Sequence, residues 1–155
     1  MQPPAIGIVT GLVLSGLTGT LNSDKICEDI TEKVVDYSDV EVESDLWYLA
    51  HIICGEAQNC DDQEQRYIAS VVLNRVADSR FPDTIADVIK DTQYGVQYAS
   101  WYDGNAMREP TQSNWENAEY VLTNGSVLPE GVIYQAGEPQ GTVYEHTRWH
   151  YYCFG

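Results

Sequence analysis

Two successive helical patterns constrain the fold of this chain most strongly. The apolar side chains of the first recur at helical spacing behind a capping Ser44 or Asp45, at Leu46, Leu49, Ala50, Ile53 and Ala57. Asp61 and Glu64 then form a D-x-x-E pattern, which predicts a capping box before a second helix over residues 63–77. The second apolar stripe comprises Ile68, Val71, Val72 and Val76. Each stripe predicts a buried helix face.

The remaining patterns predict a mainly helical α+β domain over residues 46–155. A short helix is expected at residues 85–90, and a hairpin or irregular loop at 93–104. Pro110 and Thr111 open a further helix, which Asn124 and Gly125 stop. Strands are expected at 132–136 and 149–154. The small β element is therefore expected partly before the last long helix and partly at the end of the chain.

The first 45 residues differ in composition from this domain. Residues 4–21 are apolar, uncharged and rich in glycine, so residues 1–21 are interpreted as a signal or anchoring segment. The lack of a preceding basic residue keeps an ordinary apolar helix or strand as the alternative. Residues 22–45 contain nine acidic residues and two lysines, which predicts a solvated, partly disordered acidic linker.

Charge and cysteine content limit the partners of this chain. The formal charge of −16 disfavours nucleic acid and anionic membrane surfaces. The 11 tyrosines and 4 tryptophans, against 2 phenylalanines, fit either a sugar-binding surface or a tyrosine-rich core. Four cysteines without C-x-x-C spacing, and three scattered histidines, predict neither a metal site nor a cofactor. The cysteines of an exported protein permit disulfides, but the sequence does not choose among three pairings.

Glu56 is the residue whose placement most suggests chemistry. It lies on or beside the apolar face of the first helix, where a carboxylate is costly unless it is paired or protonated. A protonated carboxyl there could act as the general acid of a glycosidase-type enzyme. The alternative is a helix-end carboxylate paired with Arg75 or a lysine.

Several short motifs in fixed order resemble the SleB-type (spore-cortex-lytic) cell-wall hydrolase family, over residues 46–154. They are Gly55-Glu56-Ala57, Gln65, Val72-Leu73-Asn74-Arg75, Phe81-Pro82, Gly95-Val96-Gln97-Tyr98, the stretch 124–136 and the closing HYYCF. The resemblance implies a lysozyme-like, lytic-transglycosylase-like fold and a catalytic domain that cleaves peptidoglycan. It places the catalytic glutamate at Glu56, acting first as acid on the glycosidic oxygen and then as base on the muramoyl C6 hydroxyl. Hydrolysis assisted by Asp103, Glu109 or Glu116 stays open.

The resemblance also implies roles for residues around Glu56. Gln97 and Tyr98 would bind acetamido groups in the cleft, and Tyr134 and Gln135 would stand on a strand beside it. Trp101 could stack on a sugar ring or pack in the core. Apart from the resemblance, Asn74 and Arg75 are expected to orient the Glu56 helix through hydrogen bonds, and His150 is expected to be a structural histidine. These assignments are expectations.

The cysteines depart from the commonest family pattern. Cys60 stands where many members carry a second glutamate, and together with Cys153 it resembles a subgroup whose pattern implies a Cys60–Cys153 disulfide. Two reduced, buried cysteines are the alternative.

The sequence leaves two alternative functions to consider. A non-catalytic module of the same fold would bind peptidoglycan without cutting it. A zinc-dependent amidase is disfavoured, because the chain lacks an H-E-x-x-H motif. The expected partner is peptidoglycan of spore cortex or vegetative wall, and the expected location is outside the cell or in its envelope, for a bacterial or phage-encoded protein. The sequence gives no oligomeric state.

Overall fold

The computed structural model describes residues 34–155, and the compact unit comprises Asp36–Gly155. The predicted signal or anchor segment and residues 22–33 of the predicted acidic linker lie outside the described residues. Within the described residues, no helix is long and apolar enough to cross a bilayer.

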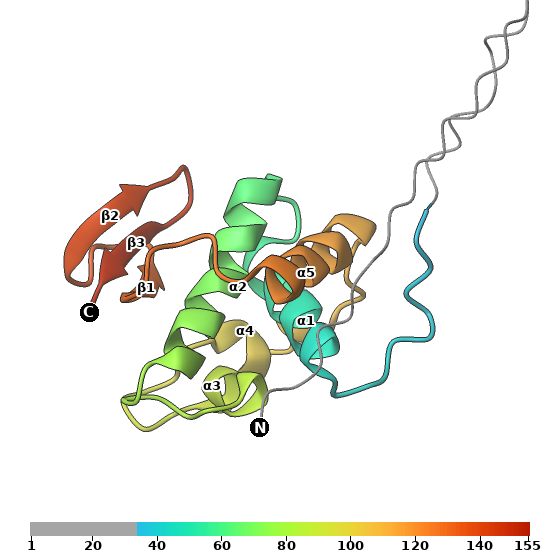
Figure 1. Ribbon diagram of the computed structural model, residues 1–155, viewed down its shortest axis with the longest axis horizontal. Helices are drawn as coiled ribbons and strands as arrows, with labels where there is room; N and C mark the ends of the chain where they lie inside the picture. The colour runs from blue at the N-terminus through green and yellow to red at the C-terminus, as the bar shows by residue number, and fades with distance from the viewer. Residues whose placement is uncertain (1–33) are drawn as a thin grey trace, which may run out of the picture. The chain divides into compact units, whose positions relative to one another are not determined.

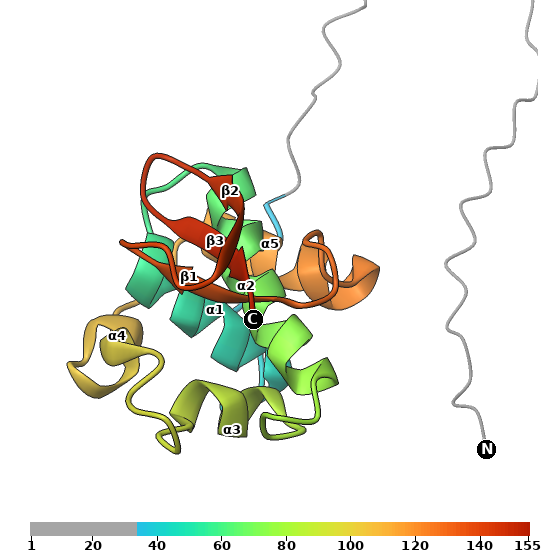
Figure 2. The same ribbon diagram turned by 90° about the vertical axis from the view of Figure 1, so that its left-hand side faces the viewer.

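Five α-helices, one 3-10 helix and three strands make up this unit (Figure 1). In chain order they are α1 (Asp45–Ala57), α2 (Asp62–Ala77), α3 (Ile85–Lys90), α4 (Ala99–Tyr102), η1 (Asn105–Met107), α5 (Gln112–Asn124), β1 (Val132–Ala136), β2 (Thr142–His146) and β3 (Tyr151–Phe154). In Figure 2 the sheet lies in front of α2, and α3 lies below α1 and α2. The mainly helical α+β fold class is thus confirmed.

The core forms where α1, α2 and α5 pack together, and both predicted stripes contribute to it. Leu49, Ile53, Ile68 and Val72 are completely buried. Trp115 of α5 joins the same core. Because burial of apolar surface is the main favourable term in folding, these helix faces hold the unit together.

The N-terminal caps of α1 and α2 agree with the sequence prediction except at Glu64. Ser44 accepts a hydrogen bond from the Trp47 amide, and Asp61 accepts one from the Glu64 amide. The Glu64 carboxylate does not return to the start of α2, so the predicted capping box is only half formed. Instead it turns inward, and Glu64 is 1% exposed.

The sheet is the part of the fold that the sequence predicted least well. It is three-stranded and antiparallel in the order β1-β3-β2, and all its strands follow α5. The prediction of a β element before the last long helix was wrong, because the stretch 93–104 contains α4. Strand β2 was not predicted. It lies at the sheet edge with four of its five residues exposed, so it lacks the alternation that marks a half-buried strand.

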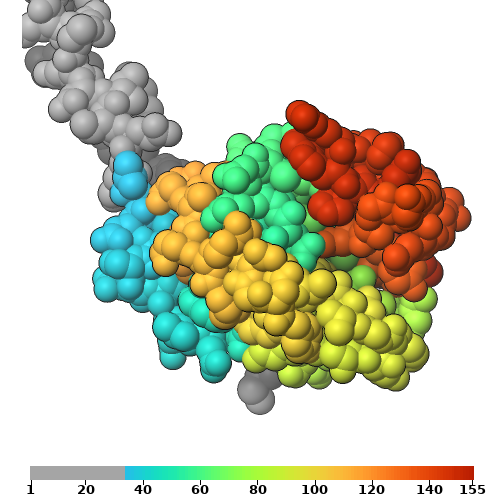
Figure 3. All heavy atoms as spheres, turned by 180° about the vertical axis from the view of Figure 1, so that it is seen from behind, coloured from blue at the N-terminus to red at the C-terminus, as the bar shows by residue number. Residues whose placement is uncertain are grey.

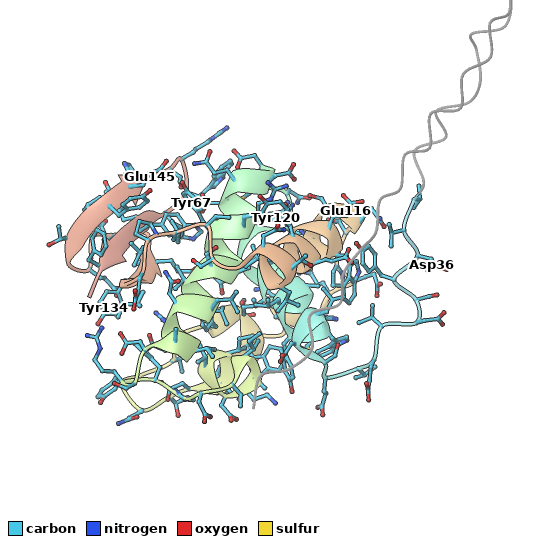
Figure 4. All side chains as sticks on the ribbon, viewed as in Figure 1. Asp36, Tyr67, Glu116, Tyr120, Tyr134 and Glu145 are labelled. Atoms are coloured by element: carbon cyan, nitrogen blue, oxygen red, sulfur yellow. The ribbon has the colours of Figure 1, made fainter. Side chains whose placement is uncertain are left out.

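Hydrogen bonds from side chains of helix α2 hold the sheet against this helix. Tyr67 donates a hydrogen bond to Glu145 of β2 at 2.7 Å (Figure 4). Asn74 donates to the Val132 carbonyl oxygen at 2.9 Å, and the Arg75 Nε donates to that of Ile133 at 2.7 Å. Asn74 and Arg75 therefore fix β1 to α2, where the prediction had them orient the Glu56 helix.

The chain just before α1 packs on the domain. Tyr37 stacks on Trp115 with ring centroids 5.5 Å apart, and its hydroxyl donates to Glu119 at 2.7 Å. Val40 is partly buried against the core. The compact unit therefore begins at Asp36 rather than at Leu46, because an aromatic contact holds part of the expected linker.

Glu64 makes the stability of this fold depend on pH. Its Oε1 accepts hydrogen bonds from His150 Nδ1 at 2.5 Å and from the Tyr152 hydroxyl at 2.7 Å. Burial acts to raise the pKa of Glu64, but the hydrogen bonds from His150 and Tyr152 outweigh burial and lower it. A lowered folded-state pKa stabilises the fold above the unfolded-state pKa, and this stabilisation is lost as the pH falls through the folded-state pKa.

Replacing Glu64 with Gln should therefore flatten the acid side of the stability profile. We expect the variant to lose on the order of 2 kcal/mol near neutral pH, because a buried carboxylate loses charge-assisted hydrogen bonds. The difference in unfolding free energy between the variant and the unsubstituted protein should become smaller as the pH falls. Urea titrations at a series of pH values from neutral to acid measure this difference, with the exposed Glu130→Gln as control. A difference that stays constant with pH would contradict this role of Glu64.

Candidate active site

Glu56 stands in the last turn of α1, next to the short helix α4. Its side chain is half-buried. The Ser100 hydroxyl of α4 donates a hydrogen bond to Glu56 Oε1 at 2.5 Å, and Ser100 is itself 6% exposed. One carboxylate oxygen is thereby fixed by a buried donor, while Oε2 has no such bond within the described residues.

Gly55 makes this approach possible. A Cβ atom built on Gly55 would lie 2.5 Å from Ser100 Oγ, 2.7 Å from Ser100 Cβ and 3.1 Å from the Ala106 Cα. Real Cβ atoms do not come this close to other heavy atoms. The glycine of the Gly-Glu-Ala motif is therefore a packing requirement, which lets α1 contact both α4 and η1.

Two further contacts fix α4 and η1 against α1. His51 Nδ1 lies 2.6 Å from the Ala106 carbonyl oxygen, to which it donates because a carbonyl can only accept. Arg108 Nη2 donates to the Cys54 carbonyl oxygen at 3.0 Å. Together with the Ser100 bond, they position the segment that carries the partner of Glu56.

The alternative pairing of Glu56 with Arg75 is not formed. Arg75 is 3% exposed and donates to the Ile133 carbonyl oxygen. Its guanidinium carbon lies 5.3 Å from the ring centroids of both Phe81 and Tyr98. Arg75 therefore packs between aromatic rings. A buried arginine needs a carboxylate or a carbonyl group as hydrogen-bond partner, and here the partner is a carbonyl group.

A pocket of about 490 Å³ lies between the segment that leads to Ser100 and strand β1. Its lining residues are Arg80, Phe81, Tyr94, Gln97, Tyr134 and Gln140. Figure 3 shows the yellow segment that carries Tyr94 and Gln97 beside the orange and red C-terminal sheet. Two of the predicted binding residues, Gln97 and Tyr134, are thus brought together at one pocket.

The other predicted binding residues lie differently. Tyr98 is 1% exposed, so it is a core residue and not a cleft residue. Among the described residues its hydroxyl has no hydrogen-bond partner. Its pKa is raised by burial and by the charge of Glu56, against the opposing effect of Arg75. Trp101 is half-buried and packs near Tyr48, with ring centroids 5.4 Å apart. Gln135 is half-buried, and its buried amide oxygen has no hydrogen-bond partner within residues 34–155.

The acidic residues considered as a second carboxylate are exposed and stand in local contacts. Asp103 accepts from the Asn105 amide at 2.8 Å, and Glu116 accepts from the Gln112 side chain at 2.9 Å. Glu109 is exposed on the segment after η1. None of the three shares the buried hydrogen bond that distinguishes Glu56.

The predicted Cys60–Cys153 disulfide is not formed, and both residues are free thiols. Tyr152 reaches Glu64 of α2, so strand alternation turns the neighbouring Cys153 toward the opposite face of the sheet. Consistent with this, a Cβ built on Gly141 would lie 3.9 Å from that of Cys153. The structure therefore favours the alternative of reduced cysteines.

Residues 34–155 hold no group of three or more His, Cys, Asp or Glu side chains arranged to bind a metal ion. His150 takes the structural role expected of it, through its bond to Glu64.

Sequence reasoning missed Ser100, which lies 44 residues from Glu56 in the chain. Replacing Ser100 with Ala should reduce the activity of the site about tenfold, because Glu56 loses the donor that orients it. The rate of the catalysed reaction measures this loss, and Ser100→Thr, which keeps a hydroxyl group, should retain most of the activity. Full activity in a folded Ser100→Ala would contradict the role of Ser100.

Comparison with known proteins identifies the family and the fold of this chain. A family model described as Cell Wall Hydrolase matches residues 60–140, beginning four residues after Glu56. No curated protein matches the chain. One similar structure is the catalytic domain of the germination-specific lytic transglycosylase SleB from Bacillus anthracis, with TM-score 0.62 and 18% identity, covering 74% of this chain and 98% of that one. Another is the catalytic domain of the Bacillus cereus SleB protein, with TM-score 0.59 and 20% identity, covering 70% and 88%.

These two structures establish the shared fold, and the family match covers more than half of the chain. This chain belongs to the Cell Wall Hydrolase family.

Proposed function

We propose that this protein cleaves the glycan strands of peptidoglycan between N-acetylmuramic acid and N-acetylglucosamine, with Glu56 as general acid and base. The observation that carries the proposal is the Ser100–Glu56 hydrogen bond of 2.5 Å at the end of α1. Membership of the Cell Wall Hydrolase family and the likeness to SleB catalytic domains support the substrate class.

The proposed reaction needs one enzyme carboxyl group. With Oε1 bound by Ser100, Oε2 of Glu56 carries the proton to the glycosidic oxygen, and the bond from that oxygen to the muramoyl C1 breaks. The resulting carboxylate then takes the proton of the muramoyl C6 hydroxyl, whose oxygen forms a new bond to C1. The products are a chain ending in 1,6-anhydromuramic acid and a chain with a free N-acetylglucosamine hydroxyl. No water is consumed, and Glu56 ends protonated.

The pocket of about 490 Å³ supports the choice of a sugar polymer. Tyr94 is 70% exposed, and Tyr94 and Tyr134 both line the pocket, so their rings offer faces on which sugars can stack. The amides of Gln97 and Gln140 can donate to and accept from the acetamido groups of both sugars.

Because peptidoglycan lies outside the cytoplasm, the proposal also places the protein in the cell envelope or beyond it. The test uses purified, dye-labelled sacculi and the full chain. Release of soluble dye supports the proposal. Binding to the sacculi without release would replace it with a non-catalytic binding module of the same fold.

A further inference from the structure

We propose that Arg80 binds a carboxylate on the lactyl substituent of muramic acid, and so distinguishes muramic acid from glucosamine in the pocket described above. The inference rests on the proposed function, since it assumes that this pocket receives the glycan. Its starting observation is charge, because the other five side chains that line the pocket are neutral.

Asp78 fixes the orientation of the Arg80 guanidinium. Arg80 Nε donates to Asp78 Oδ1 at 2.9 Å, and Nη2 donates to Asp78 Oδ2 at 2.6 Å. Nη2 also donates to the carbonyl oxygen of Gly155 at 3.3 Å. Nη1 has no hydrogen bond within the described residues, and the Arg80 side chain is 51% exposed. A preoriented group thus retains unused donors at the pocket.

Asp78 is not a lining residue of this pocket. It lines a separate pocket of about 370 Å³, together with Asn74, Ala77, Ser79, Glu130 and Gly131. The carboxylate of Asp78 therefore holds the guanidinium from a neighbouring pocket, while Arg80 is presented to the glycan pocket. The pKa of Arg80 is raised, chiefly by the Asp78 hydrogen bond, so the group stays charged.

Arg80 is a positive charge in a strongly acidic protein. The chain carries 24 acidic and 8 basic residues, so an anionic ligand is generally repelled. A carboxylate can bind here only through local hydrogen bonds. The two N–H groups of Nη1 are the guanidinium donors left to supply them, because Nε and Nη2 already donate to Asp78 and Gly155. Because Asp78 offsets part of the charge, geometry rather than field strength should set the selectivity.

The chemistry of the substrate offers such a carboxylate at one of its two sugars. Muramic acid differs from glucosamine by a lactyl ether, which ends in a free carboxylate or in an amide to the stem peptide. In the second case the peptide itself carries carboxylates. The shared ligand is a carboxylate on the muramoyl substituent, and the two sources can be compared directly.

The test measures binding without cleavage, by calorimetry on the full chain carrying Glu56→Gln. Three ligands differ only at the lactyl group of a GlcNAc-MurNAc disaccharide: the free acid, the dipeptide derivative and the uncharged methylamide. We expect Arg80→Gln to weaken binding of a carboxylate-bearing ligand about tenfold and to leave the methylamide unchanged. Whichever of the free acid and the dipeptide shows the larger loss identifies the source of the carboxylate.

Two further variants sharpen the test. Arg148→Gln removes an exposed arginine from the β2–β3 loop and should not change any of the affinities. Arg80→Lys keeps the charge but not the orientation that the two bonds to Asp78 give the guanidinium, so it should restore only part of the loss. Thermal unfolding checks that each variant is folded.

The outcomes separate this inference from the proposed function. Equal weakening of all three ligands by Arg80→Gln, or no weakening, would overturn the role of Arg80 and leave cleavage by Glu56 in place. Equal binding of the three ligands before Arg80 is changed would also overturn it. Failure to bind any disaccharide would overturn the role of Arg80, because this pocket would then not receive the glycan, whereas dye release from sacculi tests cleavage by Glu56 separately.

Discussion

Glu56→Gln should retain the fold and lose cleavage of peptidoglycan by about a thousandfold. Gln has nearly the same shape as Glu, and its amide oxygen can still accept the hydrogen bond that Ser100 donates at 2.5 Å. It cannot transfer a proton to the glycosidic oxygen. The rate of dye release from labelled sacculi measures the loss, and circular dichroism with thermal unfolding measures the fold.

Glu130→Gln is the matched control for this prediction. Glu130 is exposed and lies outside the pocket assigned to the glycan, so its replacement should leave the rate unchanged. A folded Glu56→Gln that cleaves at the rate of the control would contradict the proposed catalyst. The acids to examine would then be Asp103, Glu109 and Glu116.

Gly55→Ala should both destabilise the protein and reduce its activity, although alanine is the better helix former. The gain in helix propensity is about 1 kcal/mol, while overpacking of a closely packed core typically costs about 1–3 kcal/mol. The new methyl would lie 2.5 Å from Ser100 Oγ and 3.1 Å from the Ala106 Cα, so α4 and η1 must move away from α1. We expect a net loss of stability of up to about 2 kcal/mol. Activity should fall as well, because Glu56 loses its bond to Ser100.

Chemical denaturation and dye release measure the two effects. Gly137→Ala is the matched control, because a Cβ at Gly137 meets nothing within 4 Å. In Gly55→Ala/Ser100→Gly the clash with Ser100 is removed, so stability should partly return while activity does not. If Gly55→Ala matched the Gly137→Ala control in both measurements, the packing argument would be wrong.

The helical frame could be predicted because its signals are local. The stripes of α1 and α2 repeat within a few residues, and the caps at Ser44 and Asp61 lie next to the helices that they start. Strand β2 carries no such signal, since it is an exposed edge strand held by β3. The contact of Tyr37 with Trp115 also depends on tertiary packing, so the start of the compact unit could not be read from composition.

In the candidate site, too, features with a local sequence signal could be predicted and features that depend on tertiary packing could not. Apolar spacing and the family motifs both singled out Glu56, but its partner Ser100 comes from a segment that is close only after folding. The motif containing Gln97 and Tyr98 was expected to contribute both side chains to the cleft. Gln97 lines the pocket, whereas Tyr98 is buried. A short motif can thus combine a pocket residue with a packing residue, and sequence alone does not separate them.

Glu64 illustrates a local rule that a stronger tertiary contact overrides. Its spacing from Asp61 predicted a capping box, yet its carboxylate binds His150 and Tyr152, which are more than 80 residues away. Two hydrogen bonds in a buried site outweigh one at an exposed helix start.

The most direct test of the proposed mechanism is the mass of the products released from purified peptidoglycan by the full chain. If Glu56 serves as both acid and base, the products should end in 1,6-anhydromuramic acid and be lighter by one water than hydrolysed muropeptides. They should be absent when Glu56→Gln is used. Products with reducing muramic acid ends would contradict this account, because they would show that water attacks C1 and that a second group activates it.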